Sequence, residues 1–188
     1  MENEIIAILN ESIKIKEGIK NLSSLIAQIS KVIINAFKNK KKVVLFGNGG
    51  SAADAQHIAA EFVGKFYKDR ESLPALAFHT NSSVLTATAN DYGYEFVFER
   101  QVSAFVEKGD ITIGISTSGN STNVIKALNK AKEKGAITVG FTGQKENKME
   151  KIVDYCLKMP SDDTPRIQEG HITVGHIICY LVEKELFC

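Results

Sequence analysis

The sequence has few of the features that mark a secreted or membrane-bound protein. It contains only three cysteines, Cys156, Cys179 and Cys188, and none of them forms a C-x-x-C pair, so the pattern favours reduced thiols over a disulfide framework. No apolar run approaches the ~20 residues that a membrane-spanning helix needs. The residues from Met1 to Glu4 lack the basic stretch of a signal peptide. We therefore expect a cytoplasmic protein with no membrane partner.

The chain also lacks an excess of charge of either sign. Its 23 Lys and Arg residues nearly balance 22 Asp and Glu residues, and the formal net charge is +1. No overall basic field is present to attract nucleic acid, so we expect no nucleic-acid partner. An anionic ligand must therefore be held locally, by backbone amides and a few side chains. The length of 188 residues and the 44% hydrophobic content suit one domain, residues 1–188, with a substantial core.

Residues 2–38 predict a long helical segment. From Ile5 to Ile33, apolar residues recur in steps of three and four, which is a heptad pattern. Ile6, Ile13 and Ile34 lie beside this pattern and widen the apolar face. The segment could pack on its own domain, as one helix or a hairpin, or against other subunits. A face this broad has more to bury than one small domain offers, so we favour an oligomerisation segment over residues 1–40, followed by an α/β core over residues 41–188.

From residue 42 onward, short apolar runs alternate with helical patterns. The predicted strands cover residues 43–46, 76–78, 111–115, 136–141 and 153–158. The predicted helices cover residues 51–66, 82–107 with an interruption near 90–93, 121–134, 145–150 and 165–186. Such alternation predicts a three-layer, doubly wound α/β fold with a five-stranded parallel sheet. Ligands of these folds lie beyond the carboxyl ends of the strands.

Residues 116–121, Ser-Thr-Ser-Gly-Asn-Ser, lie between a predicted strand and a predicted helix. They carry four hydroxyl groups within six residues, those of Ser116, Thr117, Ser118 and Ser121. Together with free amides and the positive end of a helix dipole, these hydroxyls predict a phosphate site. The alternative, that Ser121 only caps the helix, accounts for one serine and leaves the other hydroxyls unexplained.

Residues 47–52, Gly-Asn-Gly-Gly-Ser-Ala, follow the first predicted strand and fit the G-x-G-x-x-A pattern of dinucleotide-binding loops. An NAD site also needs an acidic residue at the end of the second strand. Here that strand is followed by His79 and Thr80. We therefore interpret this loop as a substrate contact, to which Asn48 and Ser51 contribute polar groups.

Four polar side chains form a candidate acid–base set. His57 and Glu61 are four residues apart on a predicted helix and share one face, and Gln168 and His176 can border one cleft from the last helix. An aldose–ketose isomerase needs a base for a carbon-bound proton and a group that moves protons between oxygens. A carboxylate and an imidazole meet that need. The same four residues also fit a mixed nitrogen and oxygen metal site, and His57 with Glu61 alone would fit a surface ion pair.

These motifs, together with Asn90-Asp91 and the segment from Arg166 to Glu169, resemble the phosphoheptose isomerases of the sugar isomerase (SIS) family over nearly the whole chain. The resemblance implies a flavodoxin-like SIS fold and a homotetramer with active sites at subunit interfaces. It also implies conversion of D-sedoheptulose 7-phosphate to D-glycero-D-manno-heptose 7-phosphate through a cis-enediol or enediolate, as the first step of ADP- or GDP-heptose synthesis for lipopolysaccharide or other surface glycans.

The resemblance also implies roles for individual residues. Glu61 would be the base at carbon, and His176 would be its acid–base partner. One zinc ion per subunit would be bound by His57, Glu61, Gln168 and His176. The implied substrate contacts are Asn48, Gly49, Gly50, Ser51, Glu61, Asn90, Asp91, Ser116, Thr117, Ser118, Ser121 and Gln168.

Three other functions remain open from the sequence. A non-catalytic tetramer of the same family, of the replication-initiator-associating type, would bind proteins, but it lacks the full acid–base set that Glu61 and His176 provide here. An SIS regulator would sense a sugar phosphate, but it normally carries a DNA-binding domain, and residues 1–40 show no helix-turn-helix. An isomerase of another sugar phosphate would share all the motifs.

Overall fold

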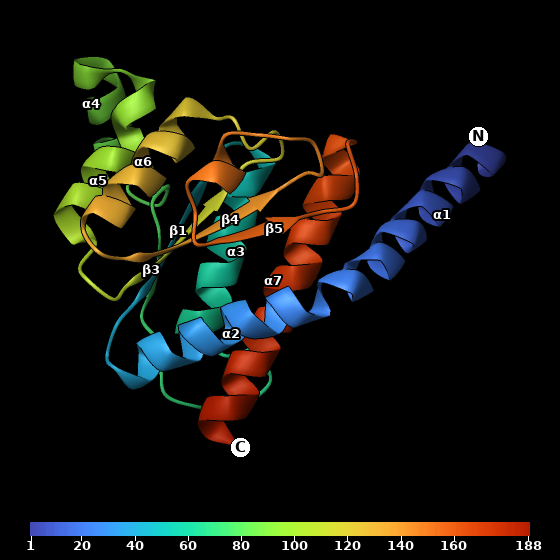
Figure 1. The fold of residues 1–188 in the computed structure, drawn as a ribbon, viewed down its shortest axis with the longest axis horizontal. Coiled ribbons are helices and arrows are strands. Elements are labelled where there is room, and N and C mark those ends of the chain that lie inside the picture. The colour runs from blue at the N-terminus through green and yellow to red at the C-terminus, as the bar shows by residue number, and fades with distance from the viewer.

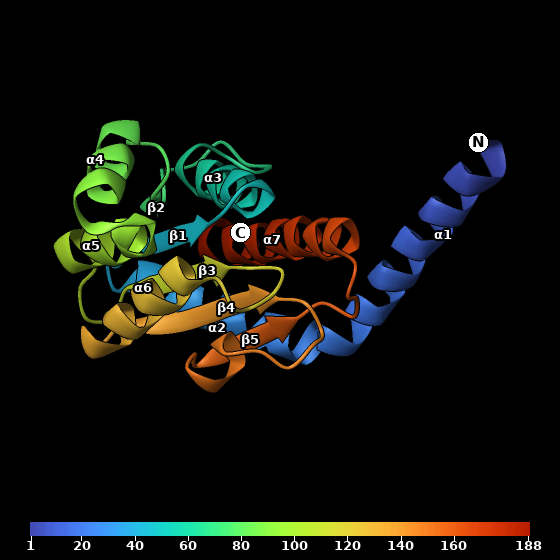
Figure 2. The same ribbon diagram turned by 90° about the horizontal axis from the view of Figure 1, so that it is seen from above.

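The computed structural model describes residues 1–188, and five parallel strands form its centre (Figures 1 and 2). The order in the sheet is β2-β1-β3-β4-β5, which is the flavodoxin-like order, and it reverses between β1 and β3. This confirms the predicted fold class. The strands are β1 (Val43–Gly47), β2 (Ala75–Ala77), β3 (Ile111–Ile115), β4 (Ile137–Thr142) and β5 (Tyr155–Lys158).

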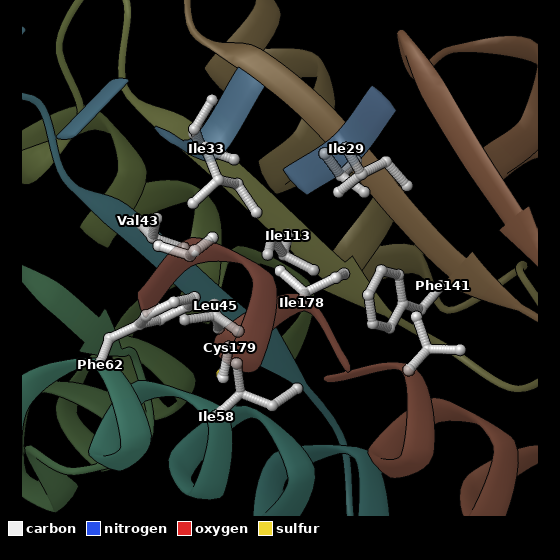
Figure 3. Packing of buried hydrophobic residues seen from close by; sticks show 14 of the residues in the cluster. Ile29, Ile33, Val43, Leu45, Ile58, Phe62, Ile113, Phe141, Ile178 and Cys179 are labelled. Carbon is white, nitrogen blue, oxygen red and sulfur yellow. The ribbon is translucent and has the colours of Figure 1, made fainter. Parts of the chain in front are cut away.

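Successive side chains of each strand point to opposite faces of the sheet, and both faces are covered. Val43 and Leu45 belong to a larger apolar cluster, which also contains side chains from three helices on that face (Figure 3). Val44 and Phe46 belong to a second cluster on the other face. The first face is covered by α2 (Ser23–Lys38), α3 (Gly50–Val63) and α7 (Thr164–Phe187), and the second by α4 (Ser82–Tyr92), α5 (Val97–Phe105) and α6 (Thr122–Glu133).

The N-terminal segment consists of two helices, and only the second packs fully on the sheet. A 3-10 turn, Lys20–Leu22, separates α1 (Glu2–Ile19) from α2, so the predicted continuous helix is interrupted. Gly18 lies just before this turn, where a Cβ atom would approach Pro160 to 2.7 Å, so the close contact requires glycine. The helix α2 buries its apolar face in the core, whereas α1 extends away from the domain (Figures 1 and 2).

The predicted interruption of the segment 82–107 near residues 90–93 is confirmed. The segment is divided into α4, a 3-10 turn (Tyr94–Phe96) and α5, because Gly93 has a positive φ of 97° that ends α4. One other predicted element differs from the structure. The predicted helix over 145–150 is only a 3-10 turn, Met149–Lys151. None of the helices is both long and apolar enough to cross a membrane.

The core contains one fully buried histidine, His171 of α7. Its Nε2 atom lies 3.3 Å from the carbonyl oxygen of Thr142, and its Nδ1 atom has no hydrogen-bond partner. Burial lowers the pKa of His171 to about 4, although the hydrogen bond to Thr142 acts in the opposite direction. The ring is therefore neutral in the native protein at ordinary pH.

This histidine predicts a pH-dependent loss of stability. Its pKa in the unfolded chain is near the ordinary value of 6.5, so between pH 6.5 and 4 the unfolded chain binds a proton that the native protein does not. Stability is complete above this window and falls as the pH is lowered through it, by up to about 3 kcal/mol from this one residue. In urea unfolding between pH 7 and 4, we expect His171→Gln to show a weaker pH dependence than wild type. Parallel curves would contradict this assignment.

Candidate active site

The two loops singled out in the sequence lie next to each other at the point where the strand order reverses. β1 pairs with β3, with Gly47 opposite Ile115, so the loops that follow both strands leave the same edge of the sheet. In the second loop, the hydroxyl oxygen of Ser116 lies 2.9 Å from that of Ser121 and 3.4 Å from that of Ser118. Three hydroxyl groups therefore converge beside the start of α6.

The structure tests the interpretation of Ser121 as a helix cap. Ser121 occupies the N-cap position of α6, but its side chain makes no capping hydrogen bond. The interpretation of Ser121 as a simple cap is therefore wrong, and its hydroxyl is directed to Ser116 instead. Gly119 has a φ of 63°, and a Cβ atom there would lie 2.6 Å from Thr142 Oγ1, so the tight turn requires glycine. Thr117 and Ser118 line an open cleft of about 240 Å³ together with Asn120, Gly143, Lys145, Glu146, Asp162, Thr164 and Ile167.

The glycine-rich loop leads directly into α3. Gly49 has a φ of 57°, and Gly50 begins the helix. A Cβ atom on Gly50 would collide with the side-chain amide of Gln168, so the last helix contacts this loop through Gln168. Ser51 is buried in the first turn of α3.

Asn48 is engaged by other side chains. Its amide exchanges two hydrogen bonds with the buried amide of Asn123, at 3.0 and 2.9 Å, and its oxygen also accepts one from the Tyr94 hydroxyl at 3.0 Å. The pair joins the glycine loop to α6, the helix that follows the serine loop. Sequence reasoning missed Asn123, although an asparagine two residues after a phosphate-type loop offers a weak signal.

The structure brings three of the four predicted acid–base and metal residues into one cluster. His57 Nε2 lies 3.1 Å from Glu61 Oε1 and 3.4 Å from His176 Nε2. The ligand atoms of all three residues lie within 4.8 Å of one another. Gln168 lies on the same helix as His176, two turns nearer the N-terminus, and its amide is directed to Gly50. The predicted pairing of the α3 and α7 side chains is therefore present.

The donor set fits a zinc ion. Neighbouring ligand atoms around a tetrahedral zinc are separated by about 3.3 Å, given zinc–nitrogen bonds of about 2.0–2.1 Å. The observed separations of 3.1 and 3.4 Å are close to this value. Two imidazoles and one carboxylate are ligands that zinc commonly takes. The cluster can therefore hold a metal ion.

Asn90 and Asp91 lie apart from this cluster, at the end of α4. Both are exposed, and the Asn90 amide donates to the Asp91 carboxylate at 2.8 Å. Their connection to the site runs through Tyr94, three residues after Asp91, which reaches Asn48. The link to the glycine-rich loop is therefore made by Tyr94, whereas Asn90 and Asp91 bond to each other.

A third polar residue on the His57 and Glu61 face of α3, Asp54, was missed by sequence reasoning. Asp54, His57 and Glu61 follow the spacing i, i+3, i+7 and share one face of the helix. Burial raises the pKa of Asp54 to about 6, although the charge of His57 acts in the opposite direction. One carboxylate oxygen is buried without a hydrogen-bond partner. The signal in the sequence was the third polar residue on the face that carries His57 and Glu61.

Comparison with known proteins agrees with this geometry. The family model of the SIS domain matches residues 9–143. The phosphoheptose isomerase of Aneurinibacillus thermoaerophilus is 55% identical over 100% of this chain and 96% of its own length. The chain belongs to the phosphoheptose isomerases of the SIS family. The structure of the phosphoheptose isomerase from Neisseria gonorrhoeae matches with a TM-score of 0.92 and 38% identity, covering 97% of this chain and 98% of that one. The enzyme from Francisella tularensis matches with a TM-score of 0.93 and 31% identity over 97% of both chains.

The contact between Gly50 and Gln168 can be tested by adding one methyl group. Gly50 lacks the positive φ of Gly49, so Gly50→Ala introduces no backbone strain and alanine favours the helix. We expect an unchanged or higher Tm, together with a loss of about tenfold or more in zinc affinity, because the change displaces Gln168, the fourth zinc ligand that the family resemblance implies. Calorimetry and competition with a chelator measure the two effects.

The matched control for this prediction is the same change in a Gln168→Ala background. The added methyl then meets no amide, so Gly50→Ala should have no further effect on zinc affinity. Equal losses in both backgrounds would show that the methyl acts elsewhere.

Proposed function

We propose that this protein is an isomerase that converts D-sedoheptulose 7-phosphate to D-glycero-D-manno-heptose 7-phosphate through a cis-enediol or enediolate. The observation that carries the proposal is the cluster of Glu61, His57 and His176 on α7 and on α3, the helix that leads out of the glycine-rich loop at the reversal point of the sheet. Relatives that carry the name phosphoheptose isomerase over their whole length support this choice of reaction. We propose that the product supplies ADP- or GDP-heptose for lipopolysaccharide or other surface glycans.

The serine loop would hold the phosphate group. Its hydroxyls and the amides at the start of α6 donate hydrogen bonds, and the helix dipole favours an anion there. The additional contacts that we propose come from Asn48, Gly49, Gly50, Ser51, Asn90, Asp91, Ser116, Thr117, Ser118, Ser121 and Gln168. The other end of the sugar would then extend toward the face where α3 and α7 meet.

Glu61 and His176 would carry the proton transfers. Glu61 removes one proton from C1 of the ketose, the C1–C2 double bond forms, and the carbonyl oxygen at C2 takes up a proton. His176 moves protons between the two oxygens. The proton is then returned to C2 while the C1 hydroxyl loses its proton, which produces the aldehyde at C1.

We propose zinc as the metal held by His57, Glu61, Gln168 and His176. When bound, zinc polarises a carbonyl or hydroxyl oxygen of the substrate and stabilises negative charge on it. The same cation lowers the proton affinity of Glu61, so metal binding and base catalysis make competing demands on this carboxylate.

We also propose that the chain forms a homotetramer with active sites at subunit interfaces, as a single cytoplasmic SIS domain with residues 1–40 as the oligomerisation segment. The supporting observation is the apolar face of α1, where Ile5, Ile8 and Leu9 are 54, 51 and 56% exposed. An isolated helix with this much exposed apolar surface is more stable when it is covered.

The exposed face of α1 gives a direct test of assembly. We expect the double variant Ile5→Ser/Leu9→Ser to shift the protein toward smaller species in sedimentation velocity, because each change removes apolar area from the proposed interface. Glu2→Gln, on the same helix, is the control and should keep the wild-type assembly. A wild-type protein that sediments as a monomer would contradict the proposed tetramer.

Replacing the proposed base tests the reaction. We expect Glu61→Gln to lower kcat by about 10² to 10⁴, since general base catalysis contributes about that much, while circular dichroism remains unchanged. Product analysis by mass spectrometry over a panel of ketose phosphates identifies the substrate. The matched control is Glu71→Gln in the loop before β2, which should keep full activity.

Four outcomes would contradict parts of this proposal. Near-normal turnover of Glu61→Gln would remove Glu61 as the base. Full activity after complete zinc removal would exclude an essential metal. No conversion of sedoheptulose 7-phosphate, with conversion of another ketose phosphate, would identify an isomerase of a different sugar phosphate, and no conversion of any of them would favour a non-catalytic relative.

A further inference from the structure

The side chain of Glu183, on α7, is a buried carboxylate that lies outside the proposed site. Its residue is only 3% exposed. Burial of a charge is costly unless it is paired and fully hydrogen-bonded. Glu183 meets this condition through three consecutive backbone amides, those of Phe66, Tyr67 and Lys68, at 3.0, 2.8 and 3.0 Å. The carboxylate therefore holds the loop that follows α3.

The partner of Glu183 is Arg70, whose side chain is 2% exposed. Arg70 Nε donates to Glu183 Oε2 at 3.0 Å. Its terminal nitrogens donate to the carbonyl oxygens of Glu61 and Phe62, both at 2.9 Å. These carbonyls belong to the last turn of α3, where no intrahelical donor is present. One guanidinium thus connects α7 to the backbone of Glu61.

A second connection leads from Glu183 to His176. Glu183 binds the amide of Phe66, and the Phe66 ring lies against the His176 ring, with centroids 5.7 Å apart. The Tyr67 ring also contacts the Phe66 ring, at 4.6 Å between centroids. The orientation of the His176 ring therefore depends on the position of the loop that Glu183 holds.

We propose that Glu183 and Arg70 are positioning residues that set the distance and orientation of Glu61 and His176 across the contact between α3 and α7. A buried ion pair that served stability alone could be replaced by apolar side chains at little cost. Here Arg70 binds the backbone carbonyl of Glu61, and Glu183 binds the backbone amide of Phe66. Glu61 belongs to the cluster with His57, and the Phe66 ring contacts His176 of the same cluster. The effect on turnover rests on the proposed function, whereas the effect on the cluster itself does not.

The test compares two buried carboxylates with similar bonds. Asp110 is fully buried, accepts backbone amides of Lys42 and Glu107 at 3.1 and 2.8 Å, and pairs with Lys42 Nζ at 2.7 Å. It lies at the opposite edge of the sheet, before β3. Glu183→Gln and Asp110→Asn therefore remove a comparable interaction near and far from the site.

The first measurement needs neither metal nor substrate. In ¹⁵N-histidine spectra of the metal-free protein at one pH, we expect Glu183→Gln to shift the His57 and His176 Nε2 resonances, and Asp110→Asn to leave both unchanged. Unchanged resonances in a folded Glu183→Gln protein, or equal shifts in both variants, would overturn the proposal. If Glu183→Gln does not fold, Phe66→Leu tests the same connection, with a shift of His176 alone expected.

The second measurement separates this proposal from the proposed function. We expect Glu183→Gln to lower kcat for sedoheptulose 7-phosphate and zinc affinity by about tenfold each, with KM nearly unchanged, because the serine loop is untouched and only the geometry at the reacting end is disturbed. Asp110→Asn should keep both values. A wild-type protein without isomerase activity would remove the proposed function but leave the resonance shifts as evidence for positioning.

Discussion

The close parallel contact between α3 and α7 is the constraint on which the candidate site depends. Both helices begin beyond the carboxyl edge of the sheet and lie side by side on one face (Figure 2). Glycines allow this approach, because a Cβ atom on Gly175 would lie 2.6 Å from Ile58 and one on Gly50 would meet Gln168. At this separation, side chains from the two helices come into contact, and the Nε2 atoms of His57 and His176 lie 3.4 Å apart.

Much of this arrangement was predictable because it depends on local patterns. Apolar runs of four to six residues between helical patterns predict a parallel sheet, and the sheet places the loops after β1 and β3 at one edge. The spacing of His57 and Glu61 places both on one helical face. The hydroxyl content of residues 116–121 indicated an anion site. The Ser121 side chain makes no capping hydrogen bond to α6, which is consistent with that interpretation.

The remainder depends on tertiary contacts that no local pattern encodes. Just before the turn at Lys20–Leu22, Gly18 lies close to Pro160, which is 142 residues away along the chain. The burial that raises the pKa of Asp54 arises only when α3 is packed in the fold. Glu183 resembled an ordinary charged residue near a helix end, and its partners are more than 110 residues earlier in the sequence. Long-range pairs of this kind cannot be read from spacing.

The proposed reaction places two negative groups in one site, the phosphate of the substrate and the carboxylate of Glu61, and the chain provides a different environment for each. A phosphate dianion close to Glu61 would disfavour a second negative charge in a medium of low dielectric constant. In the loop after β3, hydroxyls and amides can bind phosphate without adding a side-chain charge. The Glu61 carboxylate lies instead in a cluster with two imidazoles, those of His57 on α3 and His176 on α7. The nearly neutral composition of the chain is therefore compatible with an anionic substrate. Recognition would rest on dipoles at one end of the ligand, and proton transfer on titratable groups at the other.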